Sequence, residues 1–425
     1  MSAAARLWPG HDLTVYEAGD YIGGHTATVD VELQGRHYAI DTGFIVFNDW
    51  TYPEFIEMLE QLGVEWQWSN MSFSLSCERT GLEYNGTSVN SLFAQRLNLL
   101  RPSFLRMIAD ILRFNARSRE LLQAADDSLT LGQYLERGGY SRSFIERYIV
   151  PMGMAIWSQP ERAMLQFPAR FFVEFFDKHG FLNVNNRPVW RTVKGGSREY
   201  ARRLVAPFRH RIRLNQRVTG VQRHSDHVRV RVRTARGEVE QFDHVFFACH
   251  SDQALAMLED PTPAEREILG AFPYQPNEAV LHTDIRMLPR NRLARAAWNY
   301  HAPDRRRAGG AASDHLALTY DMNLLQNITA PEVFMVTLNR SAEIDPARVL
   351  GRYVYDHPVY TTAGVAAQAR RREISGVNRS FYCGAYWRYG FHEDGVVSAR
   401  WAVEDFERLL DGAAPHGRTA LAASA

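Results

Sequence analysis

The chain has 425 residues, of which 45% are hydrophobic and 23% are charged, and its formal net charge is +1. This length suits two intertwined domains, and the balanced charge gives no sign of nucleic acid binding. Three widely separated cysteines, with no C-x-x-C, predict neither disulfides nor a metal site. No secretion leader and no run of about 20 apolar residues is visible, so we expect a cytoplasmic protein.

The first informative segment runs from Leu13 to Gly24. Residues 13–16 predict a short buried parallel strand, and Glu17 follows where such a strand ends at the ligand crevice. An acid at this position binds the ribose of a dinucleotide. In such a unit a glycine-rich phosphate loop precedes the acid by about 20 residues. The residues before Glu17 are too few to include that loop and the strand before it. Residues 2–8 are the expected end of the first helix.

The segment that follows predicts a hairpin. Residues 28–40 alternate between apolar and polar and turn at Gln34-Gly35, which returns the chain toward Thr42-Gly43. Apolar spacing then predicts a helix over 51–62 and strands over 66–76, 82–88, 279–284, 296–300, 315–320 and 333–338. These strands suit an antiparallel sheet.

Residues 91–127 have a different character, because apolar side chains repeat every three or four positions and arginines fill many of the others. A basic amphipathic region of this kind binds anionic membranes or acyl substrates, which suggests peripheral membrane contact through residues 96–119. A lid helix on a substrate domain gives the same pattern, and we prefer it because amphipathic helices are common on globular proteins. The apolar, methionine-containing segment 151–157 is expected either to line a hydrophobic tunnel or to belong to the core. We prefer the core, because methionine fills irregular gaps there.

Later segments carry further signals. Gly195-Gly196-Ser197 precedes a helix over 198–205, where free amides attract carbonyls or anions. The chain then predicts a β-meander over 213–249, a strand over 380–385, an aromatic loop over 386–391, a helix over 396–410 and a disordered tail over 412–425.

Glu17-Ala18 with Gly23-Gly24-His25-Thr26 resembles the E-A-x-x-x-x-G-G-[RH]-x segment of the superfamily of flavin-dependent amine oxidases, protoporphyrinogen oxidases and phytoene desaturases. The segments 41–44 and 390–395 are similar to a bacterial subgroup described only as predicted NAD/FAD-binding proteins, and the similarity runs from about Asp12 to Leu410. The resemblance implies FAD as the cofactor. The implied cofactor-binding residues are Glu17, Gly23, Gly24, His25, Thr42, Gly43, Val218, Gly384, Asp394, Gly395, Val396 and Val397.

The resemblance also implies an α/β fold. A doubly wound parallel FAD/NAD(P)-binding sheet, without its first strand and loop, joins a substrate domain made of an antiparallel sheet and helices. The FAD-binding parts are 1–50, 191–250 and 371–411, the substrate domain is 51–190 and 251–370, and its helical insertion is 91–180.

The sequence therefore predicts an FAD-dependent oxidoreductase that oxidises or desaturates a largely apolar, lipid-like small molecule by hydride transfer to flavin. Candidate catalytic residues are His392, Glu393 and Tyr389, with Lys194 a weaker one, and each has an equally good structural interpretation. Without the phosphate loop, a cofactor-poor relative that acts only as a binding protein is the alternative. A misassigned start codon explains the same observation more simply.

Overall fold

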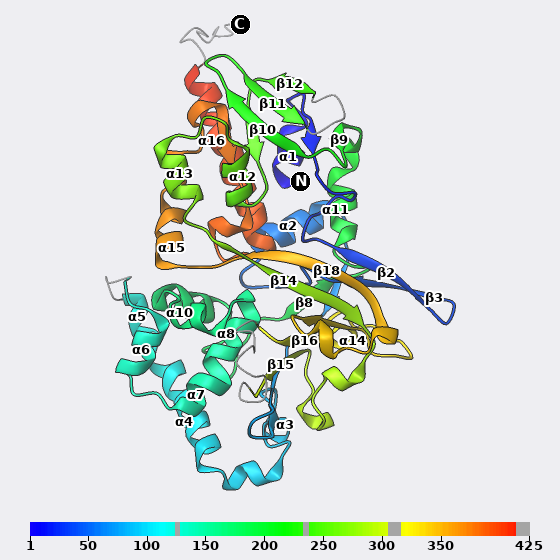
Figure 1. Cartoon of the computed structure of the whole chain (residues 1–425), viewed down its shortest axis with the longest axis vertical. Helices are drawn as coiled ribbons and strands as arrows, with labels where there is room; N and C mark the ends of the chain where they lie inside the picture. Colours follow the sequence, from blue (N-terminus) through cyan, green and yellow to red (C-terminus); the bar gives the residue numbers. More distant parts are fainter. Residues whose placement is uncertain (124–127, 233–237, 305–315, 414–425) are drawn as a thin grey trace, which may run out of the picture.

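The computed structural model describes residues 1–123, 128–232, 238–304 and 316–413, and the molecule is elongated (Figure 1). The end that holds the N-terminus contains short parallel strands covered by helices, whereas the opposite end is helical, and a mostly antiparallel sheet lies between them. The α/β class expected from the sequence is confirmed. Among the described helices, none is long and apolar enough to cross a bilayer.

Two parallel strand pairs form the first part of the fold. β1 (Val15–Tyr16) pairs with β9 (Ile212–Arg213), and β13 (Val245–Phe247) pairs with β19 (Ser380–Tyr382). Beside them lies an antiparallel sheet of β10 (Val218–Arg223), β11 (Val228–Val232) and β12 (Val239–Phe242). The helices here are α1 (Ser2–Leu7), α11 (Arg198–Val205), α12 (Ser251–Met257), α13 (Pro263–Leu269), α15 (Thr362–Ala369) and α16 (His392–Ala413).

The central sheet has seven strands. Their order is β18 (Val349–Pro358), β14 (Tyr274–His282), β17 (Met335–Leu338), β16 (Leu318–Asp321), β15 (Trp298–Ala302), β6 (Phe73–Cys77) and β7 (Leu82–Asn85). Only β15 and β6 run parallel among these paired strands. Next to this sheet are the hairpin β2 (Thr28–Leu33) and β3 (Arg36–Asp41), the strands β4 (Val46–Asn48), β5 (Trp66–Trp68) and β8 (Trp190–Val193), and the helices α2 (Pro53–Gln61) and α14 (Met322–Leu325).

The helical end is packed against the sheet through one hydrophobic cluster. Phe114 and Phe172 from the helices and Leu75 and Leu281 from the strands belong to it. Its helices are α3 (Val89–Leu92), α4 (Pro102–Arg117), α5 (Glu120–Gln123), α6 (Leu131–Arg137), α7 (Arg142–Phe144), α8 (Val150–Trp157), α9 (Glu161–Leu165) and α10 (Ala169–Lys178), and the short 3-10 helix η1 (Arg96–Leu100) precedes α4.

Three sequence expectations need correction. The last helix begins at His392, not at residue 396, because Gly390 turns the chain at φ 95° and the Asp394 carboxylate accepts the Phe391 amide in the first turn. That helix extends to Ala413, and the expected tail from residue 414 lies outside the described residues. The meander begins at Val218 because Asn215 adopts φ 56°. The described part of the basic region, residues 91–123, consists of several helices, in agreement with the helical prediction.

Candidate functional site

A cavity of about 1670 Å³ lies among the parallel strands, the central sheet and the helical end. One end, called here the nucleotide end, is lined by Glu17, Val218 and residues 241–250. The other, called the substrate end, is lined by residues between Ile45 and Trp190 together with Trp298, Tyr320 and Leu338. The volume exceeds the roughly 300–1,000 Å³ of a single small-molecule site. The cavity therefore has room for a cofactor and a substrate.

Glu17 follows β1 directly and lines the nucleotide end, as the sequence predicts. Its Oε1 accepts a hydrogen bond of 2.7 Å from the Gly19 amide, and its own amide donates to the Arg213 carbonyl at 3.0 Å. These bonds hold the carboxylate at the end of a parallel strand, where open α/β sheets bind their ligands. The ribose contact itself remains a prediction.

Gly23 and Gly43 permit a close backbone approach. A Cβ atom at Gly43 would lie 2.0 Å from the His25 carbonyl oxygen, and one at Gly23 would lie 2.4 Å from the Thr26 carbonyl oxygen. Gly23 also has φ 137°, a conformation that favours glycine. The Phe44 amide donates to the same His25 carbonyl at 2.9 Å. Both glycines thus bring His25 and Phe44 to the cavity wall; direct cofactor contact remains a prediction.

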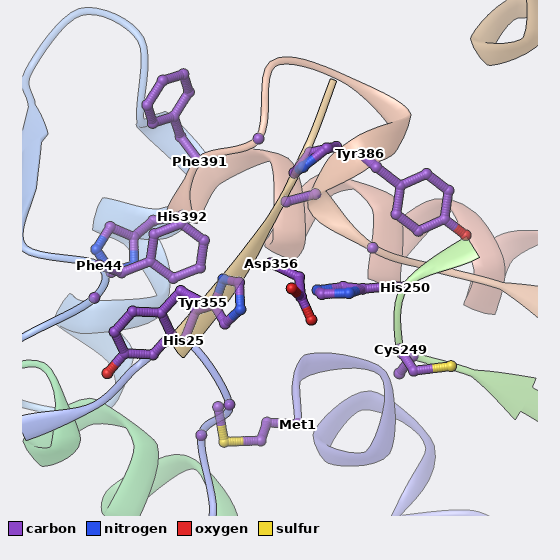
Figure 2. Close-up of a pocket in the computed structure, with 18 of the residues that line it drawn as sticks. Met1, His25, Phe44, Cys249, His250, Tyr355, Asp356, Tyr386, Phe391 and His392 are labelled. Atoms are coloured by element: carbon purple, nitrogen blue, oxygen red, sulfur yellow. The ribbon is translucent and has the colours of Figure 1, made fainter. Parts of the chain in front are cut away.

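His25 belongs to a cluster in the middle of the cavity that the sequence did not predict. Its ring centroid lies 5.1 Å from that of Tyr355, 5.4 Å from that of His250 and 5.7 Å from that of His357. Burial, and then the neighbouring histidines, lower the pKa of His25 to about 3. Figure 2 shows the Asp356 carboxylate beside the His250 ring. His250 directly follows the segment expected to be a strand, the same signal that identified Glu17.

His392 lines the cavity at the start of α16. Its ring lies between Phe55 and Phe44, with centroids 4.5 Å and 4.8 Å away, and Figure 2 shows it next to Phe44. Nδ1 lies 3.2 Å from the Tyr200 hydroxyl, which lies 2.6 Å from the hydroxyl of Thr26. Burial lowers the pKa of His392 to about 3, so the imidazole is neutral. Its buried Nε2 has no partner among the described residues, which leaves it available to a ligand.

Glu393 and Asp394 point away from the cavity lining. The Glu393 carboxylate accepts the amides of Glu54 and Phe55, at 3.2 Å and 2.8 Å, and so caps the first turn of α2. Burial raises its pKa to about 7. Asp394 accepts the Phe391 amide at 2.9 Å and lies 3.4 Å from Arg388, and burial raises its pKa to about 6. These contacts give both acids a structural role, and their catalytic and cofactor-binding roles stay predictions.

Tyr389 and Lys194 differ in position. Tyr389 lines the cavity and packs on Phe171, with centroids 4.6 Å apart. Lys194 is half exposed and its Nζ donates to Glu65 at 3.0 Å, and it is absent from the cavity lining. Tyr389 therefore stays a candidate, whereas Lys194 is held at the surface.

The remaining predicted residues divide into two groups. Gly24, Thr42 and Gly384 line the cavity, whereas Gly395, Val396 and Val397 do not. The Gly395 amide donates to the Phe391 carbonyl at 3.2 Å, so it is used inside α16, although no atom lies within 4 Å of the Cβ position of Gly395. Cofactor contacts of these six residues stay predictions.

The amides at the Gly195-Gly196-Ser197 turn also have an internal partner. The Ser197 amide and hydroxyl donate to the buried Asp41 carboxylate, at 2.9 Å and 3.2 Å, and Thr28 donates to it as well. Burial raises the pKa of Asp41 to about 7. The anion attracted to this turn is therefore a carboxylate of the chain itself.

One group of possible metal ligands lies outside the cavity. Ligand atoms of Glu78, His301 and Glu343 come within 4.8 Å of one another. Arg340 donates to both Glu343 oxygens, and the Asp304 amide and His301 occupy the oxygens of Glu78. These partners explain the cluster without an ion.

The profile of the family described as flavin-containing amine oxidoreductase matches residues 1–284. The chain belongs to this family. It is therefore an FAD-dependent oxidoreductase, and the expected cofactor is confirmed at the family level. A search of curated protein sequences finds no match.

Solved structures share the fold of this chain. A cyclohexylamine oxidase from Brevibacterium oxydans is 15% identical with a TM-score of 0.67, and the match covers 96% of this chain and 97% of that one. A putrescine oxidase bound to putrescine is 14% identical, with a TM-score of 0.65 and 96% coverage of each chain. A fatty acid isomerase from P. acnes that produces CLA is 14% identical, with a TM-score of 0.62 and coverage of 96% and 95%. Identities this low establish the fold alone.

The cavity of this flavin-containing amine oxidoreductase suits FAD in both size and chemistry. The nucleotide end offers an acid after a parallel strand. The middle offers the buried Nε2 of His392 and the buried hydroxyl of Tyr386, neither of which has a partner among the described residues. A bound ligand with polar ring atoms satisfies such groups. Glu17 and Val218 would hold the nucleotide, and Thr42 and Gly384 the ring side. FAD supplies the two-electron acceptor when bound.

Proposed function

We propose that this oxidoreductase introduces a double bond into a largely apolar, lipid-like substrate held at the substrate end of the cavity. The substrate gives up a hydride equivalent from one carbon and a proton from the neighbouring carbon, and the bond between the two carbons becomes double. FAD, when bound, would take up both and so be reduced by two electrons. The chain orients the substrate and excludes water. Neutral His392, with its available Nε2, is placed to accept or donate a hydrogen bond beside the reacting carbon.

The composition of the substrate end carries this proposal. Met152, Ile156 and Trp157 of α8 line the cavity, so the segment 151–157 supplies a tunnel wall and not only core. Phe73 and Trp298 add apolar surface from adjacent parallel strands. Among the described lining residues of this end there is no Asp or Glu to pair with an ammonium group. An apolar chain, and not a short diamine, suits such a surface.

Anaerobic bleaching of the bound flavin tests the proposal. The FAD-loaded protein is mixed without oxygen with long-chain carboxylates, long-chain alcohols, cyclohexylamine and putrescine. We expect an apolar chain to bleach the flavin and the two amines to leave it oxidised. Bleaching by either amine alone would assign the site to amine oxidation instead.

We also propose that the protein docks on anionic membranes through a surface called here the leucine tip, formed by Val89, Leu97, Leu99 and Leu100. Leu100 is 80% exposed, Val89 75% and Leu97 71%. Residues 86–109 contain three arginines and no acid. Exposed aliphatic side chains within a basic, acid-free segment suit an interface of anionic headgroups and acyl chains.

The leucine tip lies next to the cavity along the chain, because Gly86 and Thr87 line the substrate end. In this proposal a substrate that leaves a membrane at the tip enters the substrate end beside Gly86 and Thr87. Sedimentation with vesicles of phosphatidylglycerol and phosphatidylcholine tests the docking. We expect Leu97→Ser with Leu100→Ser to abolish binding and the matched change Leu409→Ser with Leu410→Ser on α16 to preserve it. Equal binding of both variants contradicts the proposal.

A further inference from the structure

Arg187 occupies an unusual place at the substrate end of the cavity. It follows α10 in the loop that contains Asn186 at φ 55°, and it lines the cavity while remaining exposed. Among the described residues that line this end, it is the one with a full charge. A single cation on an otherwise apolar lining is a specificity feature, since polar groups in ligand sites are few and fix orientation.

Only one nitrogen of the Arg187 guanidinium forms a hydrogen bond to the described residues. Its Nε donates to the Asn183 carbonyl at 2.9 Å, and among the described residues it forms no ion pair. The carboxylates of the preceding helix α10 form ion pairs of their own, Asp177 with Arg119 at 2.7 Å and Glu174 with Lys178 at 2.5 Å. The two terminal nitrogens of Arg187 thus keep the fork geometry that binds carboxylate or phosphate.

Tyr148 provides a second donor close to Arg187. Its side chain lines the same end of the cavity, and its hydroxyl has no hydrogen-bond partner among the described residues. Burial raises the pKa of Tyr148, and the positive charge of Arg187 acts against that rise. A neutral hydroxyl and a guanidinium that face one cavity can both donate to the same anion.

We infer that Arg187 and Tyr148 bind the anionic head of the substrate, which makes the substrate a long-chain carboxylate or another anionic amphiphile. This inference rests on the proposed function and specifies the head group that the apolar substrate carries. The chain of the amphiphile then lies along Met152 and Ile156 toward His392. Because Arg187 is exposed, the bound carboxylate keeps part of its hydration, which avoids the cost of burying a charge.

The same geometry disfavours amines. An ammonium head at this position meets the positive charge of Arg187 and finds no acid in the described lining of the substrate end. Like charges in a partly desolvated site repel, and an unpaired buried ammonium is costly. Arg187 and Tyr148, called here the anchor, therefore favour anionic substrates. In this respect the chain differs from oxidases that accept cationic substrates.

Binding of cis-parinaric acid to the FAD-loaded protein, followed by its fluorescence, tests the anchor without turnover. We expect Arg187→Met to weaken binding by about tenfold or more, the size of a lost charge-assisted hydrogen bond. Arg187→Lys should retain part of the affinity. Arg142→Met, an exposed arginine outside the cavity lining, is the matched control and should bind like the parent.

The methyl ester of the same acid separates the possible outcomes. We expect the ester to bind the parent about as weakly as the acid binds Arg187→Met, and to be insensitive to that change. Equal affinity of acid and ester, or unchanged binding in Arg187→Met, overturns the anchor and leaves an apolar substrate standing. If neither probe binds the parent, both the anchor and the proposed apolar substrate are wrong.

Discussion

The Nδ1 atom of His392 lies 3.2 Å from the hydroxyl of Tyr200, and this contact links the cavity to a buried chain of hydroxyl groups. The Tyr200 hydroxyl lies 2.6 Å from the hydroxyl of Thr26. Thr26 directly follows His25, whose carbonyl oxygen lies close to Gly43. A neutral imidazole has one donor and one acceptor nitrogen. The direction of the hydrogen bonds from Thr26 through Tyr200 to Nδ1 of His392 therefore determines whether Nε2 donates or accepts in the cavity. Tyr200 is thus a positioning residue for His392.

The two acid–base candidates at the start of α16 should respond differently to alanine. Glu393→Ala removes the cap of α2 and leaves two amides unsatisfied, so we expect a loss of about 1–2 kcal/mol in unfolding free energy with unchanged flavin reduction. His392→Ala should instead retain flavin and change the rate of anaerobic flavin reduction. Denaturant unfolding and single-turnover absorbance measure both properties. The reverse pattern would make Glu393 the catalytic residue.

A pH dependence of stability follows from His392. Its folded pKa is depressed to about 3 by burial, so the unfolded state binds the extra proton first. The stability that neutral His392 contributes is fully present above the unfolded pKa of about 6.5 and is lost as the pH falls toward 3. At about pH 5 the loss amounts to about 1–2 kcal/mol. His392→Phe should lose less stability than the parent between about pH 8 and pH 5 in urea unfolding. Equal losses would contradict the depressed pKa, because His392 would then take up its proton over the same pH range in the folded and the unfolded protein.

Glu17 is expected to contribute to cofactor affinity and not to folding. Glu17→Ala should weaken FAD binding by about 1.5–3 kcal/mol, the range for a hydrogen bond to a charged group, with an unchanged melting temperature. Equilibrium titration of FAD with the apoprotein provides the measurement. Unchanged affinity would make Glu17 a surface acid of the turn that Gly19 closes.

Gly43 and Gly86 both line the cavity, and their alanine variants provide a test and a control for close packing of the cavity wall. An added Cβ at Gly43 meets the His25 carbonyl at 2.0 Å, whereas the Cβ position of Gly86 has no atom within 4 Å. We therefore expect Gly43→Ala to displace the segment beside His25 and to lower flavin occupancy, and Gly86→Ala to retain it. Flavin absorbance per purified chain tests this difference, and full occupancy in Gly43→Ala contradicts the geometry.

The sequence predicted features that depend on local patterns. The hairpin over 28–40, the acid after β1 and the helix over 198–205 all follow from alternation, strand ends and glycine signals. It did not predict the cluster of His25, His250 and His357, because the tertiary fold alone brings together residues so distant in the chain. Glu393 and the Gly195-Gly196-Ser197 turn looked like ligand sites because their internal partners, α2 and Asp41, are also distant.

Cofactor and substrate are expected at opposite ends of one cavity, and two bulky substitutions test that arrangement most directly. Ile156→Trp fills the substrate end and Val218→Trp fills the nucleotide end, and each is measured for flavin content and for anaerobic bleaching by a long-chain carboxylate. We predict that Ile156→Trp retains FAD and no longer bleaches, whereas Val218→Trp loses FAD. Loss of FAD from Ile156→Trp together with full occupancy in Val218→Trp would contradict the assignment.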